Sequence, residues 1–216
     1  MDALLLGAWT DPHGAQSILD IGTGCGILAL MLAARCEAKI TALDIDHDSA
    51  REAAENFIQS AYHQRLVVKE VDFNTYCTTC TQKFELVISN PPFFIQDQLS
   101  ASKRKARARH ASSLTYDQLL KGVAGILSEN GRLCVVLPYE EGNLFWKLAE
   151  DEYGLYLSRQ MVIFPRRGLT PNRLHLELSR KPVKKTNVGR FVIREEEGHF
   201  SEAYKKLLGD FLIAIP

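Results

Sequence analysis

Residues 18–27 constrain the fold of this chain more than any other stretch. The first four of them are mostly apolar and β-favouring, which is typical of a buried parallel strand. Three glycines then follow at alternate positions and lead into an apolar, helix-forming run at residues 27–34: Gly22, Gly24 and Gly26. A strand, a glycine turn and a helix bring backbone N–H groups and a helix N-terminus up to a ligand. The segment therefore predicts a cofactor-binding turn.

The spacing of the glycines separates two classes of cofactor. A dinucleotide fingerprint reads G-x-G-x-x-G, whereas this turn reads D-x-G-x-G-x-G from Asp20, with Thr23 after the first glycine. A carboxylate at Asp20 would repel a pyrophosphate but could hold an ammonium group, directly or through water. A second predicted strand ends at Asp44, where a carboxylate can accept both hydroxyls of a ribose. An ammonium and a ribose without a phosphate indicate S-adenosylmethionine rather than NAD, and we favour this over a purely structural turn.

Size and composition bound the class of protein. A chain of 216 residues with 46% hydrophobic content predicts one α/β domain over residues 1–216. No apolar run approaches the roughly 20 residues that span a membrane, and no secretory signal opens the chain. The five cysteines are odd in number and scattered, which indicates reduced thiols and a cytoplasmic location. Cys77 and Cys80 form a C-x-x-C pair, but without a second pair we interpret it as a loop coincidence and expect no metal.

Predicted strands and helices alternate along the chain. The strands lie at residues 17–21, 39–44, 66–70, 84–89 and 132–137, and the helices at residues 3–9, 26–35, 49–59, 116–127, 142–152 and 201–208. Asp46 or Asp48 is expected to cap the third of these helices, and Asn130-Gly131 to end the fourth. Residues 155–164, 174–179 and 191–194 are also strand-like, and the first two are expected to pair antiparallel. The order predicts an α/β fold with a central, mostly parallel seven-stranded sheet, an antiparallel edge and helices on both faces.

Four of the predicted parallel strands are followed by residues that could bind a ligand: Gly22, Asp44, Asp72 and Asn90. In open α/β sheets, ligands bind at the carboxyl ends of the strands. The four positions therefore predict a single site at one edge of the sheet.

The segment Asn90-Pro91-Pro92-Phe93 follows the fourth strand and predicts the chemistry. The prolines fix the backbone, so an asparagine side-chain oxygen and a backbone carbonyl can together hold a planar –NH2 group. Phe93 offers a face on which a flat base can stack. Two acceptors on the amine hydrogens favour the more nucleophilic form as a bond to methyl develops, and no general base is required. A mere turn is the weaker interpretation because the motif lies beside the predicted cofactor site.

A net charge of zero hides a strong segregation of charge. Residues 98–116 contain five bases and no acid: Lys103, Arg104, Lys105, Arg107 and Arg109. Residues 159–194 contain ten bases and one acid, and include Arg166, Arg167 and Arg173. Two such runs indicate a basic face for a nucleic acid. Ordinary solvated charge is the alternative.

These motifs together resemble the class I S-adenosylmethionine-dependent methyltransferases that carry an Asn-Pro-Pro-Phe/Tyr motif. More closely, the chain resembles the bacterial tRNA1(Val) (adenine-37-N6)-methyltransferase family. The matching stretches are residues 2–9, 20–33, 88–93, 108–110, 134–138, 192–194 and 201–204, so the resemblance covers nearly the whole chain.

The resemblance implies a Rossmann-like fold and N6 methylation of an adenine in the anticodon loop of a tRNA. Asp44 would bind the cofactor ribose, and Asp72 with Phe73 the cofactor adenine. Asn90 and Pro91 with Phe93 would hold the target adenine, and the basic run from Lys103 would help dock the tRNA. The predicted cofactor-binding set is Asp20, Gly22, Thr23, Gly24, Gly26, Asp44, Ile45, Asp72, Phe73 and Asn90. The family usually has further residues before Asp2 that help close the pocket, so we expect a domain without this N-terminal extension.

Other functions remain open. A protein glutamine-N5 methyltransferase shares the clamp, although its separate helical recognition domain is missing here. An rRNA or DNA amino-methyltransferase is possible because the clamp does not specify its polymer. A non-enzymatic alternative is an S-adenosylmethionine- or RNA-binding module made inactive by truncation. We interpret His110, His175 and His199 as surface or packing residues, and expect a monomer that binds no membrane.

Overall fold

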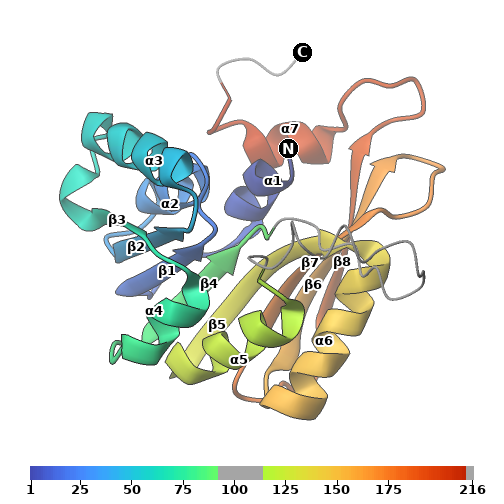
Figure 1. The fold of residues 1–216 in the computed structure, drawn as a ribbon. Helices are drawn as coiled ribbons and strands as arrows, with labels where there is room; N and C mark the ends of the chain where they lie inside the picture. Colours follow the sequence, from blue (N-terminus) through green and yellow to red (C-terminus); the bar gives the residue numbers. More distant parts are fainter. Residues whose placement is uncertain (92–113, 213–216) are drawn as a thin grey trace, which may run out of the picture.

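The computed structural model describes residues 1–91 and 114–212, and these form one mixed α/β sheet structure (Figure 1). The strands are β1 (Ser17–Ile21), β2 (Lys39–Asp44), β3 (Leu66–Glu70), β4 (Phe84–Ser89), β5 (Leu127–Pro138), β6 (Tyr156–Arg166), β7 (Arg173–Ser179) and β8 (Asn187–Arg194). The helices are α1 (Asp2–Trp9), α2 (Ile27–Ala33), α3 (His47–Gln59), α4 (Phe73–Thr79), α5 (Tyr116–Ile126), α6 (Tyr139–Tyr153) and α7 (Glu202–Leu208), with a 3₁₀ turn at His63–Arg65.

The strand order is β3-β2-β1-β4-β5-β7-β6-β8. The first five strands in this order are parallel, and β7 pairs antiparallel with both β5 and β6. The expected antiparallel edge is therefore confirmed. The expected number of strands is corrected from seven to eight, because β8 pairs in parallel with β6 from Asn187 to Arg194.

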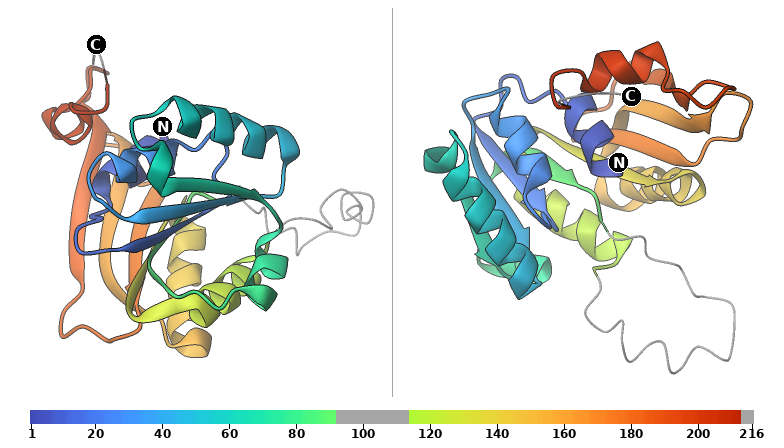
Figure 2. Two further views of the ribbon diagram at one scale, coloured as in Figure 1. Left: turned by 90° about the vertical axis from the view of Figure 1, so that its left-hand side faces the viewer. Right: turned by 90° about the horizontal axis from the view of Figure 1, so that it is seen from above.

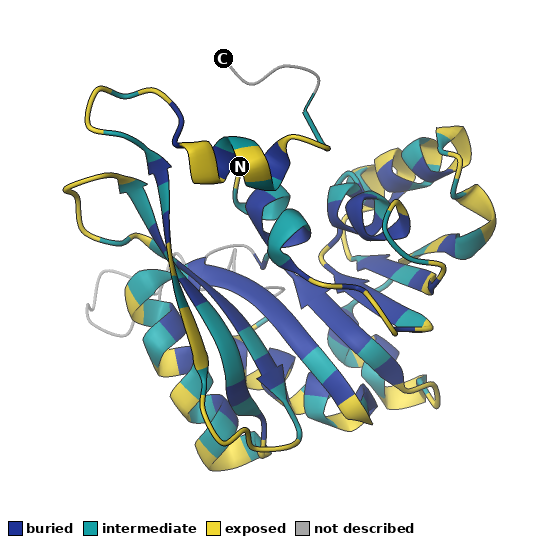
Figure 3. Ribbon diagram, turned by 180° about the vertical axis from the view of Figure 1, so that it is seen from behind, coloured by how far each residue is buried: buried dark blue, intermediate teal, exposed yellow. Residues whose placement is uncertain are grey.

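Helices cover both faces of the sheet, as expected (Figures 1 and 2). Helices α4, α5 and α6 pack on one face, around side chains such as Tyr76, Leu119 and Phe145. Helices α1, α2 and α3 cover the other face at β1 and β2, and α1 with α7 covers β6 and β8. Figure 3 shows dark blue, buried residues along the central strands and yellow, exposed residues on outer helix surfaces and loops.

Two local expectations are corrected. Helix α4 was not expected, but Asp72 caps it by accepting a 2.9 Å hydrogen bond from the backbone N–H of Thr75. Asn130 and Gly131 do not end α5, because that helix stops at Ile126 and both residues lie in β5. A side chain at position 131 would approach the carbonyl oxygen of Phe84 to 2.8 Å, so the glycine permits close strand packing.

Of the two proposed caps for α3, Asp46 makes the hydrogen bond, accepting from the backbone N–H of Ser49 at 2.9 Å. Across the part of the chain that the structure describes, no helix is both long and apolar enough to cross a membrane.

Candidate active site

The carboxyl ends of four parallel strands meet at one edge of the sheet. Ile21, the last residue of β1, lies opposite Leu43 of β2 and Ser89 of β4. Asp44 at the end of β2 lies opposite Glu70 at the end of β3. The structure therefore brings the glycine turn, Asp44, Asp72 and Asn90 to neighbouring strand ends, as the sequence predicts.

The glycine turn is fixed to the adjacent strand. The backbone N–H groups of Gly22 and Thr23 both donate to the carbonyl of Leu43 at 2.9 Å. Gly22 and Gly24 have φ values of 70° and 56°, in the left-handed region that favours glycine. No atom lies within 4 Å of the position a side chain would occupy at either residue, so the space beside the turn is open.

Gly26 has a different role from the other two glycines. It precedes α2 with a φ of 85°, and a side chain there would meet the ring of Phe57 at 2.5 Å. Gly26 is therefore required for packing of α2 against α3 rather than for space beside a ligand.

Asp20 is a buried carboxyl group with one unused oxygen. Its Oδ2 accepts a 2.6 Å hydrogen bond from the hydroxyl of Thr23, whereas its Oδ1 has no partner among the described residues. Burial and, to a smaller extent, the nearby Asp44 carboxylate raise the pKa of Asp20 to about 7, although the hydrogen bond from Thr23 acts in the opposite direction. A buried unpaired oxygen is costly unless a ligand or water completes it. The position therefore fits the predicted ammonium group.

Both oxygens of Asp44 are oriented by the backbone. Oδ2 accepts from the N–H of Gly24 at 2.8 Å, and Oδ1 accepts from the N–H of Asp46 at 3.0 Å. A carboxylate oxygen has a second lone pair, so both can still accept a ribose hydroxyl. The next residue, Ile45, has 54% of its surface exposed, which places an apolar side chain in solvent beside this carboxylate.

Asp72 lies at the site edge of the sheet, whereas the side chain of Phe73 lies in the core. The Asp72 carboxylate caps α4 and also accepts from the Thr75 hydroxyl at 3.2 Å. The Phe73 ring is buried beneath α5, where a side chain at Gly122 would meet it at 2.5 Å. Only the main chain of Phe73 can therefore face a ligand, through an N–H in the first helical turn.

Half of the predicted clamp lies within the described residues. Asn90 is half-buried directly after β4, and Pro91 is buried. The hydroxyl of Ser89 donates to the carbonyl of Ile21 at 2.8 Å, which joins β4 to β1 next to Asn90. Pro92 and Phe93 lie outside the described residues.

The predicted RNA-binding residues fall into three groups. The basic run Lys103, Arg104, Lys105, Arg107 and Arg109 lies outside the described residues, and Arg166 is exposed at the end of β6. Arg167 forms an ion pair with Glu195, and Arg173 donates to Asp2 at 2.8 Å. Arg173 therefore ties β7 to α1.

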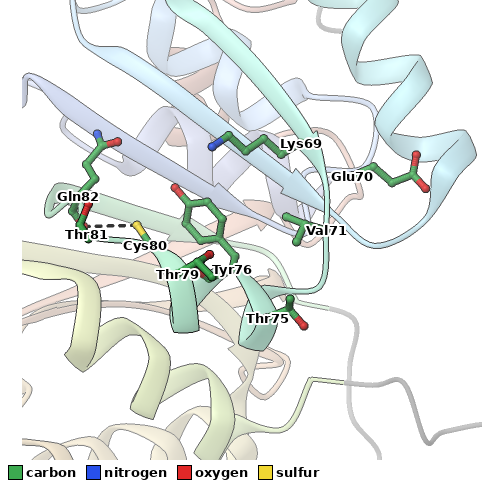
Figure 4. Close-up of a pocket in the computed structure, with 9 residues that line it drawn as sticks. All are labelled: Lys69, Glu70, Val71, Thr75, Tyr76, Thr79, Cys80, Thr81 and Gln82. Carbon is green, nitrogen blue, oxygen red and sulfur yellow. Dashed lines mark hydrogen bonds between the residues drawn. The ribbon is translucent and has the colours of Figure 1, made fainter.

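A further cavity of about 500 Å³ lies between β3 and α4 (Figure 4). The ammonium of Lys69 lies 5.2 Å from the centre of the Tyr76 ring. The side chains of three threonines also line the cavity: Thr75, Thr79 and Thr81. No sequence pattern predicts this cavity, because its walls come from a strand and an unexpected helix.

One cysteine of the C-x-x-C pair, Cys80, lines this cavity. Cys77 lies in α4 rather than in a loop, and burial raises its thiol pKa to about 11. Cys80 donates to the carbonyl of Gln82 at 3.5 Å. In the described part of the chain, no three His, Cys, Asp or Glu side chains group as a metal site.

Comparisons with known proteins identify the family of this chain. The family model of the methyltransferase small domain matches residues 2–143. A tRNA1(Val) (adenine(37)-N6)-methyltransferase of Bacteroides fragilis is 37% identical over 98% of this chain and 89% of the relative. A protein of the same name from Tolumonas auensis is 38% identical over 98% of this chain and 88% of the relative.

Solved structures share the fold at low identity. A predicted O-methyltransferase from Agrobacterium tumefaciens superposes with a TM-score of 0.73 at 18% identity, covering 97% of this chain and 96% of that one. TrmN from Thermus thermophilus superposes with a TM-score of 0.55 at 20% identity, covering 76% of this chain and 44% of that one. The family model over residues 2–143 and the relatives matched over 98% of this chain show that it belongs to the tRNA1(Val) (adenine(37)-N6)-methyltransferase family.

Proposed function

We propose that this protein transfers a methyl group from S-adenosylmethionine to the N6 amine of adenine 37 in the anticodon loop of a valine tRNA. The observation that carries the proposal is the match to relatives of that name over 98% of this chain, combined with Asn90 at the end of β4. A tRNA substrate is consistent with the expected cytoplasmic location.

The residues at the strand ends fit the cofactor. S-adenosylmethionine, when bound, supplies a methyl group activated by a positively charged sulfur. The unpaired Oδ1 of Asp20 would take the ammonium, directly or through water, and the carboxylate of Asp44 would take the ribose hydroxyls. Asp72 and the N–H of Phe73 would receive the adenine edge, and Ile45 would cover its face. The open space beside Gly22 and Gly24 leaves room for the amino-acid part.

Asn90 and Pro91 position the target amine. The lone pair of an aryl amine is delocalised into the ring, so the amine is a weak nucleophile. Hydrogen bonds from its two N–H groups to the Asn90 side chain and the Pro91 carbonyl would favour the pyramidal form that reacts. The proton is lost after methyl transfer, so the chain needs no general base. The predicted stacking of the base on Phe93 completes this part of the proposal.

The RNA substrate must present its adenine outside a duplex. A base in an anticodon loop is already nearly single-stranded, so extruding it costs a few kcal/mol or less. Basic residues would contact phosphates and orient the loop without reading its sequence.

Transfer of labelled methyl tests the proposal. The substrates are tRNA lacking the modification, rRNA and a glutamine-containing release-factor peptide, with Asn90→Ala and the exposed Asn130→Ala as matched variants. We expect N6-methyladenosine in tRNA alone, lost with Asn90→Ala and retained with Asn130→Ala. Label in rRNA or in the peptide instead would contradict the proposed tRNA substrate, but it would be compatible with the proposed role of Asn90 and Pro91.

A further inference from the structure

The outer strands β6 and β8 carry basic residues without acidic ones. Neither strand contains an Asp or a Glu. Phe191 and Ile193 of β8 point into the cluster with α1 and α7. The alternate residues therefore point to the opposite face of the sheet, where Val188 is 60% exposed and Arg190 is exposed.

Arg190 lies over an aromatic ring and has no acidic partner among the described residues. Its guanidinium carbon lies 4.2 Å from the centre of the Phe164 ring on β6. Among the described residues, Arg190 makes no ion pair and no side-chain hydrogen bond. Stacking of this kind fixes the plane of a guanidinium and leaves its N–H edge free for an anion.

Arg194, four residues further along β8, also lies over an aromatic ring. Its guanidinium carbon lies 3.9 Å from the centre of the Phe200 ring, and its Nη1 donates to the carbonyl of Gly198 at 2.6 Å. Arg166 of β6 is its register partner. Within residues 1–91 and 114–212, neither arginine forms an ion pair. Like charges on paired strands repel one another, so an anion bound between the two guanidinium groups would offset this electrostatic repulsion.

The neighbouring arginines behave differently. Arg159, Arg167 and Arg173 are paired with Glu177, Glu195 and Asp2. Three arginines of β6 and β8 form no ion pair among the described residues, and we call them the β6–β8 arginine cluster: Arg166, Arg190 and Arg194. Of the predicted RNA-binding residues in β6, β7 and the loop between them, Arg167 and Arg173 are paired with acids and Arg166 is not, whereas Arg190 and Arg194 were not predicted.

The cluster lies toward the site edge of the sheet. Because β7 is antiparallel to both β5 and β6, strands β5 and β6 run in the same direction, and β8 runs with β6. The carboxyl ends of β6 and β8, with Arg166 and Arg194, therefore face the same edge as Asn90 after β4. Guanidinium groups with free edges match the oxygens of a phosphodiester.

We propose that the β6–β8 arginine cluster binds phosphodiester groups of the substrate tRNA outside the target nucleotide. This inference rests on the proposed function and identifies the surface that docks the RNA. Such contacts orient the RNA and add salt-dependent affinity without sequence specificity.

The test measures binding of an unmodified valine tRNA transcript over a series of salt concentrations. Arg190→Gln with Arg194→Gln is compared with Arg51→Gln with Lys121→Gln, which removes two exposed positive charges elsewhere. We expect the cluster variant to bind tRNA roughly tenfold more weakly, with a salt slope reduced by about one to two. The control variant should bind like wild type, and both should keep the wild-type affinity for S-adenosylmethionine.

A second variant guards against misfolding. Arg190→Lys with Arg194→Lys keeps both charges, so most of the salt dependence should return. Equal tRNA affinity of the glutamine variant and the control would overturn the inference. So would a lower melting temperature of both cluster variants, if unfolding accounts for the weaker tRNA binding. Failure of the proposed function gives a different result, because wild-type protein would then form no N6-methyladenosine in tRNA.

Discussion

The hydroxyl of Thr23 donates a 2.6 Å hydrogen bond to Oδ2 of Asp20, while Oδ1 of the same buried carboxyl group has no partner in the described structure. The bond orients the carboxyl group and leaves one oxygen for a ligand. Burial raises the pKa of Asp20 to about 7 from a reference of 3.8. The group suited to hold the cofactor therefore destabilises the ligand-free fold once it ionises.

The first prediction is that Asp20→Asn stabilises the ligand-free protein at pH 8 and weakens cofactor binding. The pKa of Asp20 is higher in the folded state, so its favourable contribution is complete below the unfolded pKa and is lost as pH rises through about 7. A difference of about three pH units corresponds to roughly 4 kcal/mol at pH 8. Thermal unfolding and calorimetric titration with S-adenosylmethionine measure both effects, and we expect an affinity loss of about tenfold or more.

Asp48→Asn is the matched control, because Asp48 is an exposed acid on α3. It should change neither the melting temperature nor the cofactor affinity by much. An Asp20→Asn protein that melts at the wild-type temperature at pH 8 would show that the buried carboxyl group is not strained.

The second prediction concerns Ile45, whose side chain is 54% exposed next to Asp44. Ile45→Ala should weaken S-adenosylmethionine binding about fivefold, because the adenine would lose an apolar contact. Stability should be nearly unchanged, since little surface is buried there without the cofactor. Ile58→Ala on α3 is the control, because Ile58 is 75% exposed. Equal affinities of the two variants would remove Ile45 from the site.

The third prediction separates the two parts of Phe73. Phe73→Leu should lower the free energy of unfolding by about 1–2 kcal/mol and leave cofactor affinity intact, because the ring packs in the core and only the N–H faces the site. Phe145→Leu in α6 is the matched variant, because Phe145 belongs to the same core cluster. Urea unfolding and cofactor titration of both variants provide the measurement. A much larger affinity loss with Phe73→Leu would mean that the ring contacts the cofactor.

The sequence predicts which strand ends meet, because the signals for the strands and the glycine turn are local. Gly22 and Gly24 have positive φ values, which favour glycine. Asp20 lies near the end of β1, Asp44 ends β2 and Asn90 follows β4, so the lengths of the strands and helices set their spacing. Parallel strands end at one edge of a sheet, so the order of the elements already implies that these residues meet. Five strands, from β1 to β5, could be located from this alternation, although β5 begins earlier than expected.

The rest depended on tertiary contacts that no local pattern encodes. The ring of Phe73 lies in the core because α5 presents Gly122 to it, which sequence spacing does not reveal. Arg167 and Arg173 were expected to be available for RNA, but their acidic partners lie 28 and 171 residues away along the chain. Helix α4 did carry a local signal, an aspartate with a threonine three residues later, which fits an N-terminal cap.

The fourth prediction concerns His175, a packing residue whose imidazole is fully buried on β7, with its ring centre 5.4 Å from that of Trp9. Burial, with the nearby Arg159 charge, lowers the pKa of His175 to about 3 from a reference of 6.5. Its contribution to stability is therefore present above the unfolded pKa and is lost as pH falls from 6.5 toward 3, by up to about 1.4 kcal/mol per pH unit. His175→Gln should remove this slope, whereas the exposed His63→Gln should keep it.

Asp20 and His175 act in opposite directions over the same range of pH. Between about pH 4 and 6.5, stability falls with rising pH because of Asp20 and rises because of His175. The two slopes oppose each other in the wild-type protein, so the single variants expose them. Relative to wild type, Asp20→Asn should gain stability as pH rises from 4 to 6.5, and His175→Gln should lose stability over the same interval. Chemical unfolding at four or five pH values measures both differences, and parallel curves for the three proteins would show that neither group titrates in the fold as its burial implies.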